Sequence, residues 1–273
     1  MARNSYTISI LMCLVLIAGC AGMIHEMHGT KSLKKGQDDA AIADLTRAIA
    51  ANPGNARAYG NRGIAYSHKG LFDQAIADQS AAIRLSPNDP RHYVNRGVCY
   101  LQTGQHEKAL ADYNQALSLN SKYAPAYNNR ACVYSKQGNY DLAIADFNKA
   151  ISIDPKFVEA YGGLGEAYMH KKNYSEALSN INHALLLDPR LDNAYVTKGL
   201  LLIKKGSYDQ AINEFNMALS LNPKKAQAYA YRAIAFYYQK KYDMALNDVN
   251  KAQSLGTKVD EQFLQELKKA AQK

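Results

Sequence analysis

The chain of 273 residues contains no tryptophan, only seven prolines and only four cysteines. So few cysteines in so long a chain exclude a miniature fold held together by disulfides. The sequence also has no phosphate-binding glycine loop, no nucleophile elbow and no zinc-ligand spacing. Its hydrophobic share of 47% and aromatic share of 10% exclude a disordered chain, so we expect a folded protein without the common catalytic motifs.

The N-terminal segment indicates secretion. One charge, on Arg3, precedes an almost entirely apolar run over residues 8–18. A run of this length is typical of a signal peptide and is too short for a comfortable membrane span. It ends in an Ala-Gly-Cys motif that resembles a bacterial lipobox, whose cysteine is Cys20. We predict that residues 1–19 are removed and that Cys20 is lipidated; an ordinary signal peptide and an uncleaved anchor are the alternatives.

The predicted anchor changes the meaning of the net charge. By the sorting pattern of similar lipoproteins, Ala21 after the cysteine implies delivery to the outer membrane, facing the periplasm. The formal net charge of +9 becomes +8 without residues 1–19, since these hold Arg3 and no acid. A secreted, lipid-anchored protein rarely meets nucleic acid, so we expect no nucleic-acid partner. Its basic surface favours anionic lipid, cell-envelope glycan or an acidic protein.

The rest of the chain repeats itself with a period of 34 residues. With Ala56 as position 1, the copies run over residues 56–89, 90–123, 124–157, 158–191, 192–225 and 226–259, and a weaker copy occupies 22–55. Position 8 is always glycine or alanine, and two helices can approach closely only where side chains are this small. Positions 20 and 27 are alanine in every copy: Ala41, Ala75, Ala109, Ala143, Ala177, Ala211 and Ala245, then Ala48, Ala82, Ala116, Ala150, Ala184, Ala218 and Ala252.

Glycine and proline mark the turns between helices. Glycine stands at position 15 in five copies, where a first helix must end. Aspartate or serine at position 18, as in Asp73 and Ser175, suits the N-cap of a second helix. Every proline lies at a junction between copies, where a missing backbone N–H costs least. The sequence therefore predicts an all-α chain of helix pairs, which we name helix A and helix B of each repeat.

Aromatic residues recur at positions 4, 11 and 17, as at Tyr59, Tyr66 and Phe72, and we interpret them as packing residues of the core. Together with small residues at positions 8, 20 and 27 and proline at 32, this pattern resembles the tetratricopeptide repeat over residues 22–259. The resemblance implies an all-α right-handed superhelix (an α-solenoid) of about seven helix-turn-helix repeats. It also implies that the A helices line a concave groove.

These patterns divide the chain into four parts. They are a signal peptide (1–19), a lipid-anchored N-terminus with a degenerate first repeat (20–55), six repeats (56–259) and a C-terminal capping helix (260–273) that covers the last apolar face. The first repeat has a good helix B but a poor helix A, which we expect to be frayed beside the lipid.

Two pairs of residues invite a chemical interpretation that we do not favour. His25 and His28 are three apart on a possible helix, but no third metal ligand is evident, so we predict no metal site and no cofactor. Cys99 and Cys132 fall at nearly equivalent positions of adjacent repeats. Such positions lie roughly a helix diameter apart, beyond the reach of a disulfide, so we interpret both residues as buried thiols.

Covariation indicates an ion pair inside each repeat, between position 7 of helix A and position 23 of helix B. Lysine faces glutamate in Lys198 and Glu214, and where the cation becomes Leu164 the acid becomes the neutral Asn180. We interpret the pair as a structural brace, with a ligand contact as the alternative. The arginine pairs are Arg62–Asp78, Arg96–Asp112, Arg130–Asp146 and Arg232–Asp248.

The groove is the candidate binding site. The resemblance implies that position 6 faces it, and this position is Asn61, Asn95 and Asn129 in three successive repeats. Asparagines in such register resemble the ladder by which some family members hold an extended peptide backbone, since an amide both donates and accepts. The alternative is that these amides satisfy the neighbouring helix backbone. Farther along, the predicted lining is apolar: Val196, Leu200, Ile203, Ile234, Tyr237 and Tyr238.

Lysines gather at positions 13–16, where the A helices end, and so mark one edge of the predicted fold. Cations at helix C-termini favour the helix dipole, which is one explanation for them. An anionic partner is the other. We call this set the lysine edge: Lys34, Lys35, Lys69, Lys136, Lys171, Lys172, Lys204, Lys205, Lys240 and Lys241.

The function that we expect is that of a protein interaction scaffold, a membrane-anchored adaptor whose groove binds extended or helical peptide segments of other envelope proteins. Similar lipoproteins act as pilotins of pilus secretins, in outer-membrane protein assembly and as adaptors of cell-wall hydrolases. The sequence chooses among none of these and does not fix the oligomeric state. A binder of anionic glycan or lipid is the alternative.

Two other functions are disfavoured. The repeats leave no room for a catalytic domain, so we expect no enzyme. The carboxylate clamp that grips chaperone C-termini needs lysine and asparagine at positions 5 and 9 of one repeat. Residues such as Gly60 and Ile64 cannot supply it.

Overall fold

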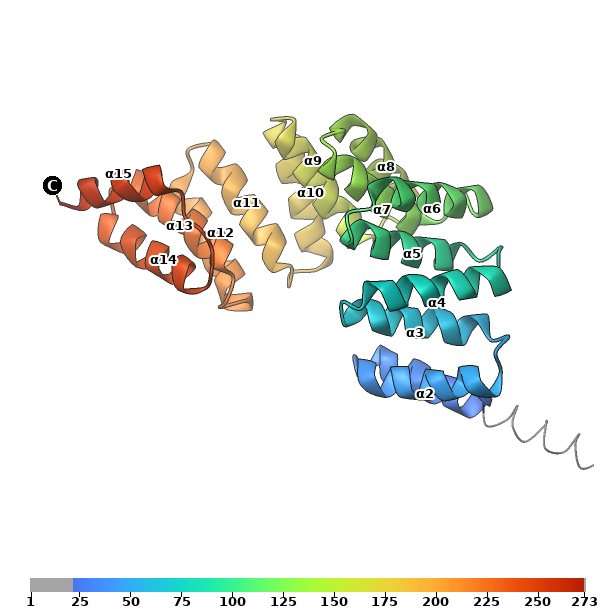
Figure 1. Cartoon of the computed structure of the whole chain (residues 1–273). Coiled ribbons are helices and arrows are strands. Elements are labelled where there is room, and N and C mark those ends of the chain that lie inside the picture. Colours follow the sequence, from blue (N-terminus) through green and yellow to red (C-terminus); the bar gives the residue numbers. More distant parts are fainter. Residues whose placement is uncertain (1–21, 273) are drawn as a thin grey trace, which may run out of the picture. The chain divides into compact units, whose positions relative to one another are not determined.

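The computed structural model describes residues 22–272, and every regular element in that part of the chain is a helix (Figure 1). A helix over residues 22–34 comes first. The others are α2 (Asp38–Ala51), α3 (Ala56–His68), α4 (Phe72–Leu85), α5 (Pro90–Gln102), α6 (His106–Leu119), α7 (Ala124–Lys136), α8 (Tyr140–Ile153), α9 (Val158–His170), α10 (Tyr174–Leu187), α11 (Asp192–Lys204), α12 (Tyr208–Leu221), α13 (Ala226–Tyr238), α14 (Tyr242–Ser254) and α15 (Glu261–Ala271).

Membrane attachment is not decided by these helices. The predicted signal peptide and the lipidated Cys20 lie outside the described residues, so both stay predictions. Among residues 22–272, no helix combines the length and the apolar character that a membrane crossing requires.

The described chain forms two compact units, one ending at Val133 and one beginning at Tyr134, which we call unit 1 and unit 2. The boundary falls within α7; on either side of it, each helix A packs against the helix B that follows it and against the helix B of the repeat before it. The alanines at positions 20 and 27 are all fully buried. A Cβ atom at Gly97 would lie only 2.6 Å from the ring of Tyr113, which shows why position 8 must stay small.

The turn between helix A and helix B is closed by a residue of positive φ at position 15. Glycine fills it in most repeats, for example Gly70 at φ 73°, whereas Lys172 and Lys240 adopt φ 61° and 62° in two repeats of unit 2. A side chain in this left-handed region is strained by roughly 1–2 kcal/mol, so glycine is the favoured residue there.

The predicted N-cap of helix B is wrong. Helix α4 begins at Phe72 with Leu71 as its N-cap, so Asp73 lies inside the first turn. The tight turn after the left-handed residue leads directly into the helix and leaves no position for a capping side chain. An aspartate in the first turn still stabilises the helix, because the dipole presents its positive end there.

The first repeat is ordered, so the expectation of a frayed helix A is wrong. Residues 22–34 are helical, with Gly29 packed against Leu45 of α2. The carboxylate of Glu26 accepts a hydrogen bond from the Asn55 amide at 2.8 Å. Contacts with α2 and α3 supply the stability that the residues of this helix lack by propensity alone.

The C-terminal helix packs on the last repeat, as a cap should. Leu267 of α15 is fully buried in a cluster with Ala233 and Val249. Asp260 is its N-cap, and its carboxylate accepts a hydrogen bond from the backbone N–H of Phe263 at 2.9 Å. This helix replaces the neighbour that a further repeat would have provided.

Candidate functional site

The predicted ion pair between positions 7 and 23 is present in both units. Arg62 donates from Nε to one oxygen of Asp78 at 2.7 Å and from Nη2 to the other at 2.8 Å. Such two-point bonding fixes the guanidinium in the plane of the carboxylate. The same geometry joins Arg96 with Asp112 and Arg232 with Asp248, and Lys198 Nζ lies 2.9 Å from Glu214.

The covariation that predicted the pair is also explained. Leu164 is only 3% exposed and packs in the core, while the Asn180 amide donates to the carbonyl of Glu176 in its own helix. Leu164 carries no charge, so this repeat needs no acid at position 23.

Each brace arginine also reaches the preceding repeat. Arg62 donates from Nη1 to the hydroxyl of Thr46 at 3.0 Å, and Arg96 does the same to Ser80. The guanidinium of Arg62 lies 5.7 Å from the ring centroid of Tyr59, within cation–π range. These side chains join helix B of their own repeat to helix B of the preceding one, which supports the structural interpretation.

The three asparagines at position 6 fall into two groups. Asn61 donates its amide to the hydroxyl of Thr30 at 2.9 Å, so it is used to join the first two repeats. Asn95 and Asn129 are half-buried and make no side-chain hydrogen bond within residues 22–272. Asn95 lines a small hollow of about 180 Å³ together with Ile64 and Val98. Two of the three amides are therefore available to a ligand.

The predicted apolar lining in unit 2 is only partly available. Val196 is 6% exposed and belongs to the core cluster around Phe215, so it offers little surface to a partner. Leu200, Ile203, Ile234 and Tyr237 are half-buried, and Tyr238 is 54% exposed.

Tyr237 and Tyr238 take part in two further features of unit 2. The Tyr238 ring stacks on Tyr208 with centroids 4.8 Å apart. Tyr237 lines a hollow of about 770 Å³ between α13, α14 and α15, together with Lys241 and Lys269. The sequence could not show this hollow, because α15 creates it and α15 lies outside the repeat pattern.

One acidic residue of unit 2 escaped the sequence analysis. Glu166 occupies position 9 of its repeat, on α9, one turn after Gly162, where an added Cβ would meet nothing within 4 Å. Although Glu166 is exposed, desolvation by the surrounding atoms raises the pKa of its carboxyl, against opposing effects of His170 and Thr197.

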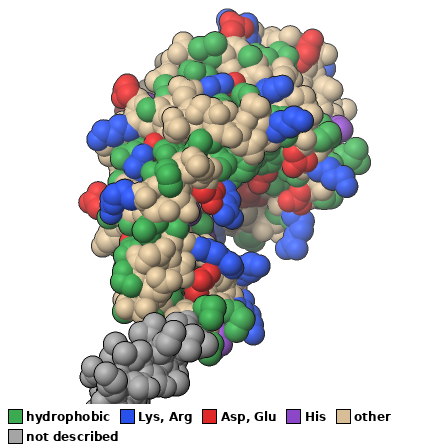
Figure 2. Space-filling model, turned by 90° about the vertical axis from the view of Figure 1, so that its right-hand side faces the viewer, with side chains coloured by type: hydrophobic (Ala, Val, Ile, Leu, Met, Phe, Trp, Pro, Cys, Tyr) green, Lys and Arg blue, Asp and Glu red, His purple; other side chains and the backbone are tan. Residues whose placement is uncertain are grey.

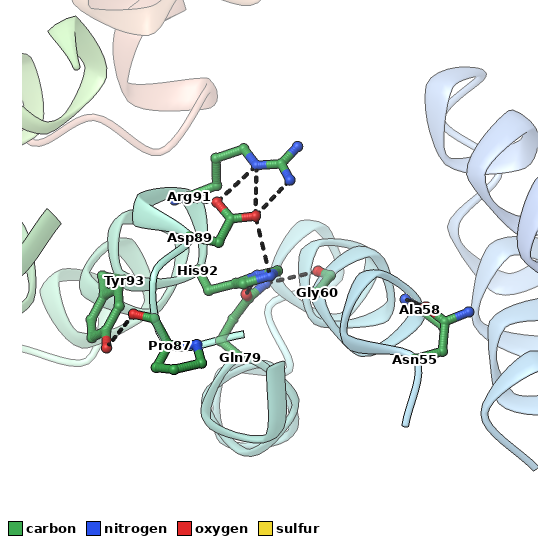
Figure 3. A network of polar contacts seen from close by, with 9 residues as sticks. All are labelled: Asn55, Ala58, Gly60, Gln79, Pro87, Asp89, Arg91, His92 and Tyr93. Carbon is green, nitrogen blue, oxygen red and sulfur yellow. Dashed lines mark hydrogen bonds and ion pairs between the residues drawn. The ribbon is translucent and has the colours of Figure 1, made fainter. Parts of the chain in front are cut away.

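A buried polar network between two repeats of unit 1 was also missed (Figure 3). Gln79 donates to the carbonyl of Gly60 at 2.8 Å, and its own oxygen lies 3.3 Å from Nδ1 of His92. Asp89 lies 3.7 Å from the other ring nitrogen. Burial lowers the pKa of His92, an effect that Asp89 partly opposes.

The signal for this network is a departure from the repeat. Position 3 is alanine in the five other repeats from residue 56 onward, but it is His92 here. A Cβ at Gly60 would lie 2.5 Å from the His92 ring, so glycine in one repeat makes room for histidine in the next.

The lysine edge lies at the turns between helix A and helix B, as expected. Its members are engaged in part: Lys69 pairs with Asp39, and Lys171 with Asp141, each across to the preceding repeat. These pairs and the helix ends account for much of the lysine without any ligand.

The described residues hold no group of three or more His, Cys, Asp and Glu side chains that could bind a metal ion. His25 lies 3.5 Å from Asp44, in α2. Cys99 and Cys132 are not joined by a disulfide, as expected, but only Cys99 is buried, and its burial raises the pKa of the thiol. Cys132 is only half-buried, so the interpretation of this residue as a buried thiol is wrong.

These features define an α-helical repeat protein whose A helices carry polar groups not used internally. The chain belongs to the tetratricopeptide repeat family. Family models described as tetratricopeptide repeat match residues 27–90, 90–123, 124–157 and 158–191, and one described as TPR repeat matches residues 199–240. No curated protein matches the chain.

Solved structures share this fold. A tetratricopeptide repeat protein from Parabacteroides merdae is 24% identical with a TM-score of 0.68, covering 93% of this chain and 100% of its own. PilF of Pseudomonas aeruginosa is 19% identical with a TM-score of 0.69, covering 77% of this chain and 97% of its own. YrrB, a TPR protein with an unusual peptide-binding site, is 21% identical with a TM-score of 0.50, covering 67% and 95%. The expected all-α repeat fold is thereby confirmed.

Proposed function

We propose that this protein is a lipid-anchored scaffold of the bacterial cell envelope that binds peptide segments of other envelope proteins on its A helices. The observation that carries the proposal is the pair of amides at Asn95 and Asn129, which make no side-chain hydrogen bond within the described part of the chain. An extended peptide backbone presents alternating N–H and C=O groups, and a carboxamide can bind both. Tetratricopeptide repeat proteins commonly act as such scaffolds, and YrrB has a peptide-binding site.

The attachment to the outer membrane rests on the sequence around Cys20, which resembles a lipobox. The similarity to PilF of Pseudomonas aeruginosa is one of fold, and the pathway served by this chain stays open.

Photo-crosslinking tests the peptide-binding proposal. A photoreactive amino acid replaces Asn95, and the same amino acid replaces Leu186 of α10 as the matched control, since Leu186 is 76% exposed on a B helix. We expect protein adducts in intact envelopes from position 95 and few from position 186. Equal adducts at both positions, or only lipid and glycan adducts, would contradict the proposal.

A second step shows that the amides themselves bind. Peptides from the captured protein are titrated against the purified chain and against the variant Asn95→Ala with Asn129→Ala. Each lost amide bond contributes about 1 kcal/mol, so the double variant should bind about 30-fold more weakly. Mass spectrometry of Cys20 tests the anchor separately.

Binding of anionic glycan or lipid through the lysine edge is the less favoured function. Lys69 and Lys171 are already paired, and the remaining lysines stand where helix ends favour cations.

A further inference from the structure

The helix over residues 22–34 exposes a face that no repeat within the described residues covers. Met23 is 63% exposed, Ile24 50% and Met27 61%. Because a helix turns by 100° per residue, these three side chains lie on one side of the helix, together with the exposed Lys31 and Lys34. We call this side the N-terminal face. Figure 2 shows hydrophobic and basic side chains close together at the lower end of the molecule.

The helix is held on its opposite side by Leu45 of α2, which packs on Gly29. Glu26 lies at the border of the N-terminal face and lines a hollow with Met23, Met27 and Lys31. Its carboxylate pairs with Arg57 of α3 at 3.0 Å and accepts the Asn55 amide. The only acid of this helix is therefore already neutralised by an arginine, which leaves the N-terminal face apolar and basic in character.

We infer that the N-terminal face docks on the anionic surface of the membrane that carries the protein, with the methionines in the headgroup boundary and the lysines on the phosphates. This inference rests on the lipid anchor proposed above. The face begins three residues after Cys20, so an acylated cysteine would hold it within about 10 Å of the bilayer surface.

The chemistry of the face matches that occupant. Interfacial helices present apolar side chains beside lysines, and each lysine near an anionic surface strengthens binding. The apolar residues here occupy the first turn and a half, and Lys31, Lys34 and Lys35 the end of the helix. An oblique approach would bury the methionines and keep the ammonium groups at the headgroups. The consequence would be a fixed orientation of the first repeat on the membrane.

A single tryptophan provides the test, because the natural sequence has none. The full chain carrying Met27→Trp is produced in a Gram-negative host, purified in detergent and reconstituted into vesicles of phosphatidylethanolamine and phosphatidylglycerol with brominated acyl chains. Leu186→Trp is the matched control, an exposed apolar residue of unit 2. We expect at least twofold stronger quenching by bromine at position 27 than at position 186, with a blue-shifted emission.

A second variant tests the lysines. Lys31→Gln, Lys34→Gln and Lys35→Gln are added to Met27→Trp, and the quenching should fall by half or more, as it should in vesicles of phosphatidylcholine alone. Equal quenching at positions 27 and 186, or no effect of the lysine variant, would overturn the inference. So would a blue shift that appears without vesicles and grows with protein concentration, which would show a second copy of the chain on this face.

Mass spectrometry of the same sample separates this inference from the anchor. An acylated Cys20 with an unquenched position 27 would leave the anchor standing and overturn the docking. An unmodified Cys20 with lysine-dependent quenching would overturn the anchor and support the docking.

Discussion

Unit 1 and unit 2 are built on the same 34-residue repeat but fill its interior differently. Position 24, the side chain of helix B that packs beneath helix A, is Leu45, Gln79 and Tyr113 in unit 1 and Phe147, Ile181, Phe215 and Val249 in unit 2. All seven are fully buried or nearly so, with exposures of 0–1%. The repeat therefore fixes the burial of this socket, while its size and polarity vary with the neighbours that each repeat supplies.

The neighbours explain which chemistry each socket accepts. Gln79 is tolerated because Gly60 and His92 hydrogen-bond its amide. Tyr113 has a buried hydroxyl without a hydrogen-bond partner among the described residues, and desolvation raises the pKa of that hydroxyl. Two of the three sockets in unit 1 thus hold polar side chains, of which Gln79 specifies particular neighbours, whereas the same layer of unit 2 relies on apolar packing.

The largest effect should come from emptying the apolar socket. Phe215→Ala removes a ring that is fully buried and should lower the free energy of unfolding by about 3–5 kcal/mol. Gln79→Ala loses the buried hydrogen bond to the Gly60 carbonyl and removes the amide oxygen beside the His92 ring, for about 1–3 kcal/mol. Urea denaturation followed by circular dichroism measures both. A larger loss for Gln79→Ala would reverse the comparison.

The brace offers a matched exchange between the units. Arg96→Leu leaves the carboxylate of Asp112 without its partner and should cost about 2 kcal/mol, less than the ~3–5 kcal/mol of a fully buried pair because the Arg96 side chain is 21% exposed. Adding Asp112→Asn recreates the combination of Leu164 and Asn180. The double variant should recover at least half of the loss in the same denaturation assay. An additive double variant would disprove the coupling.

The polar network should make unit 1 sensitive to acid. Burial lowers the pKa of His92, so the unfolded chain binds its proton more readily than the folded chain does. Stability is then complete above about pH 6.5, the ordinary value for histidine, and falls as the pH drops through the lowered folded value. His92→Ala, which restores the residue of the other repeats, should remove this part of the pH dependence. Urea midpoints at pH 7.5 and pH 5 measure it, and an unchanged slope in the variant would contradict the assignment.

The smallest effect is a gain. Tyr113→Phe removes the unpartnered hydroxyl and converts the socket of unit 1 to the residue that Phe147 and Phe215 provide in unit 2. We expect a rise of about 1 kcal/mol in the free energy of unfolding. A loss of stability would show that the hydroxyl has a partner after all, such as an ordered water.

Most of the repeat architecture could be predicted because its signals are local. Each of the main signals concerns residues that meet within one repeat: the alanines at positions 20 and 27, the glycine at position 15, and the paired charges at positions 7 and 23. The N-cap prediction failed because aspartate is a residue type that often caps helices, whereas the start of α4 is set by the left-handed residue Gly70. The helix over residues 22–34 was expected to fray because the residues that hold it, Leu45 and Asn55, lie far from it in the sequence.

The candidate site shows the same division. The sequence placed Asn61, Asn95 and Asn129 in register, but it could not show that Thr30 already occupies the first of these amides. It marked Val196 as a lining residue by position, and packing against Phe215 removed it from the surface. The His92 network was missed because it depends on a side chain that the preceding repeat omits at Gly60, and Glu166 was missed beside Gly162 of its own helix, which also lacks a side chain.

By itself, the sequence determined the period, the helix pairs, the small residues at their contacts and the partners of the brace, since a repeating pattern states which side chains must meet. Only the tertiary structure decided which polar groups of the A helices are already satisfied, and which side of the first helix remains bare. Hydrogen bonding and burial at those places are set by atoms from two or three helices at once, and no single repeat contains that information.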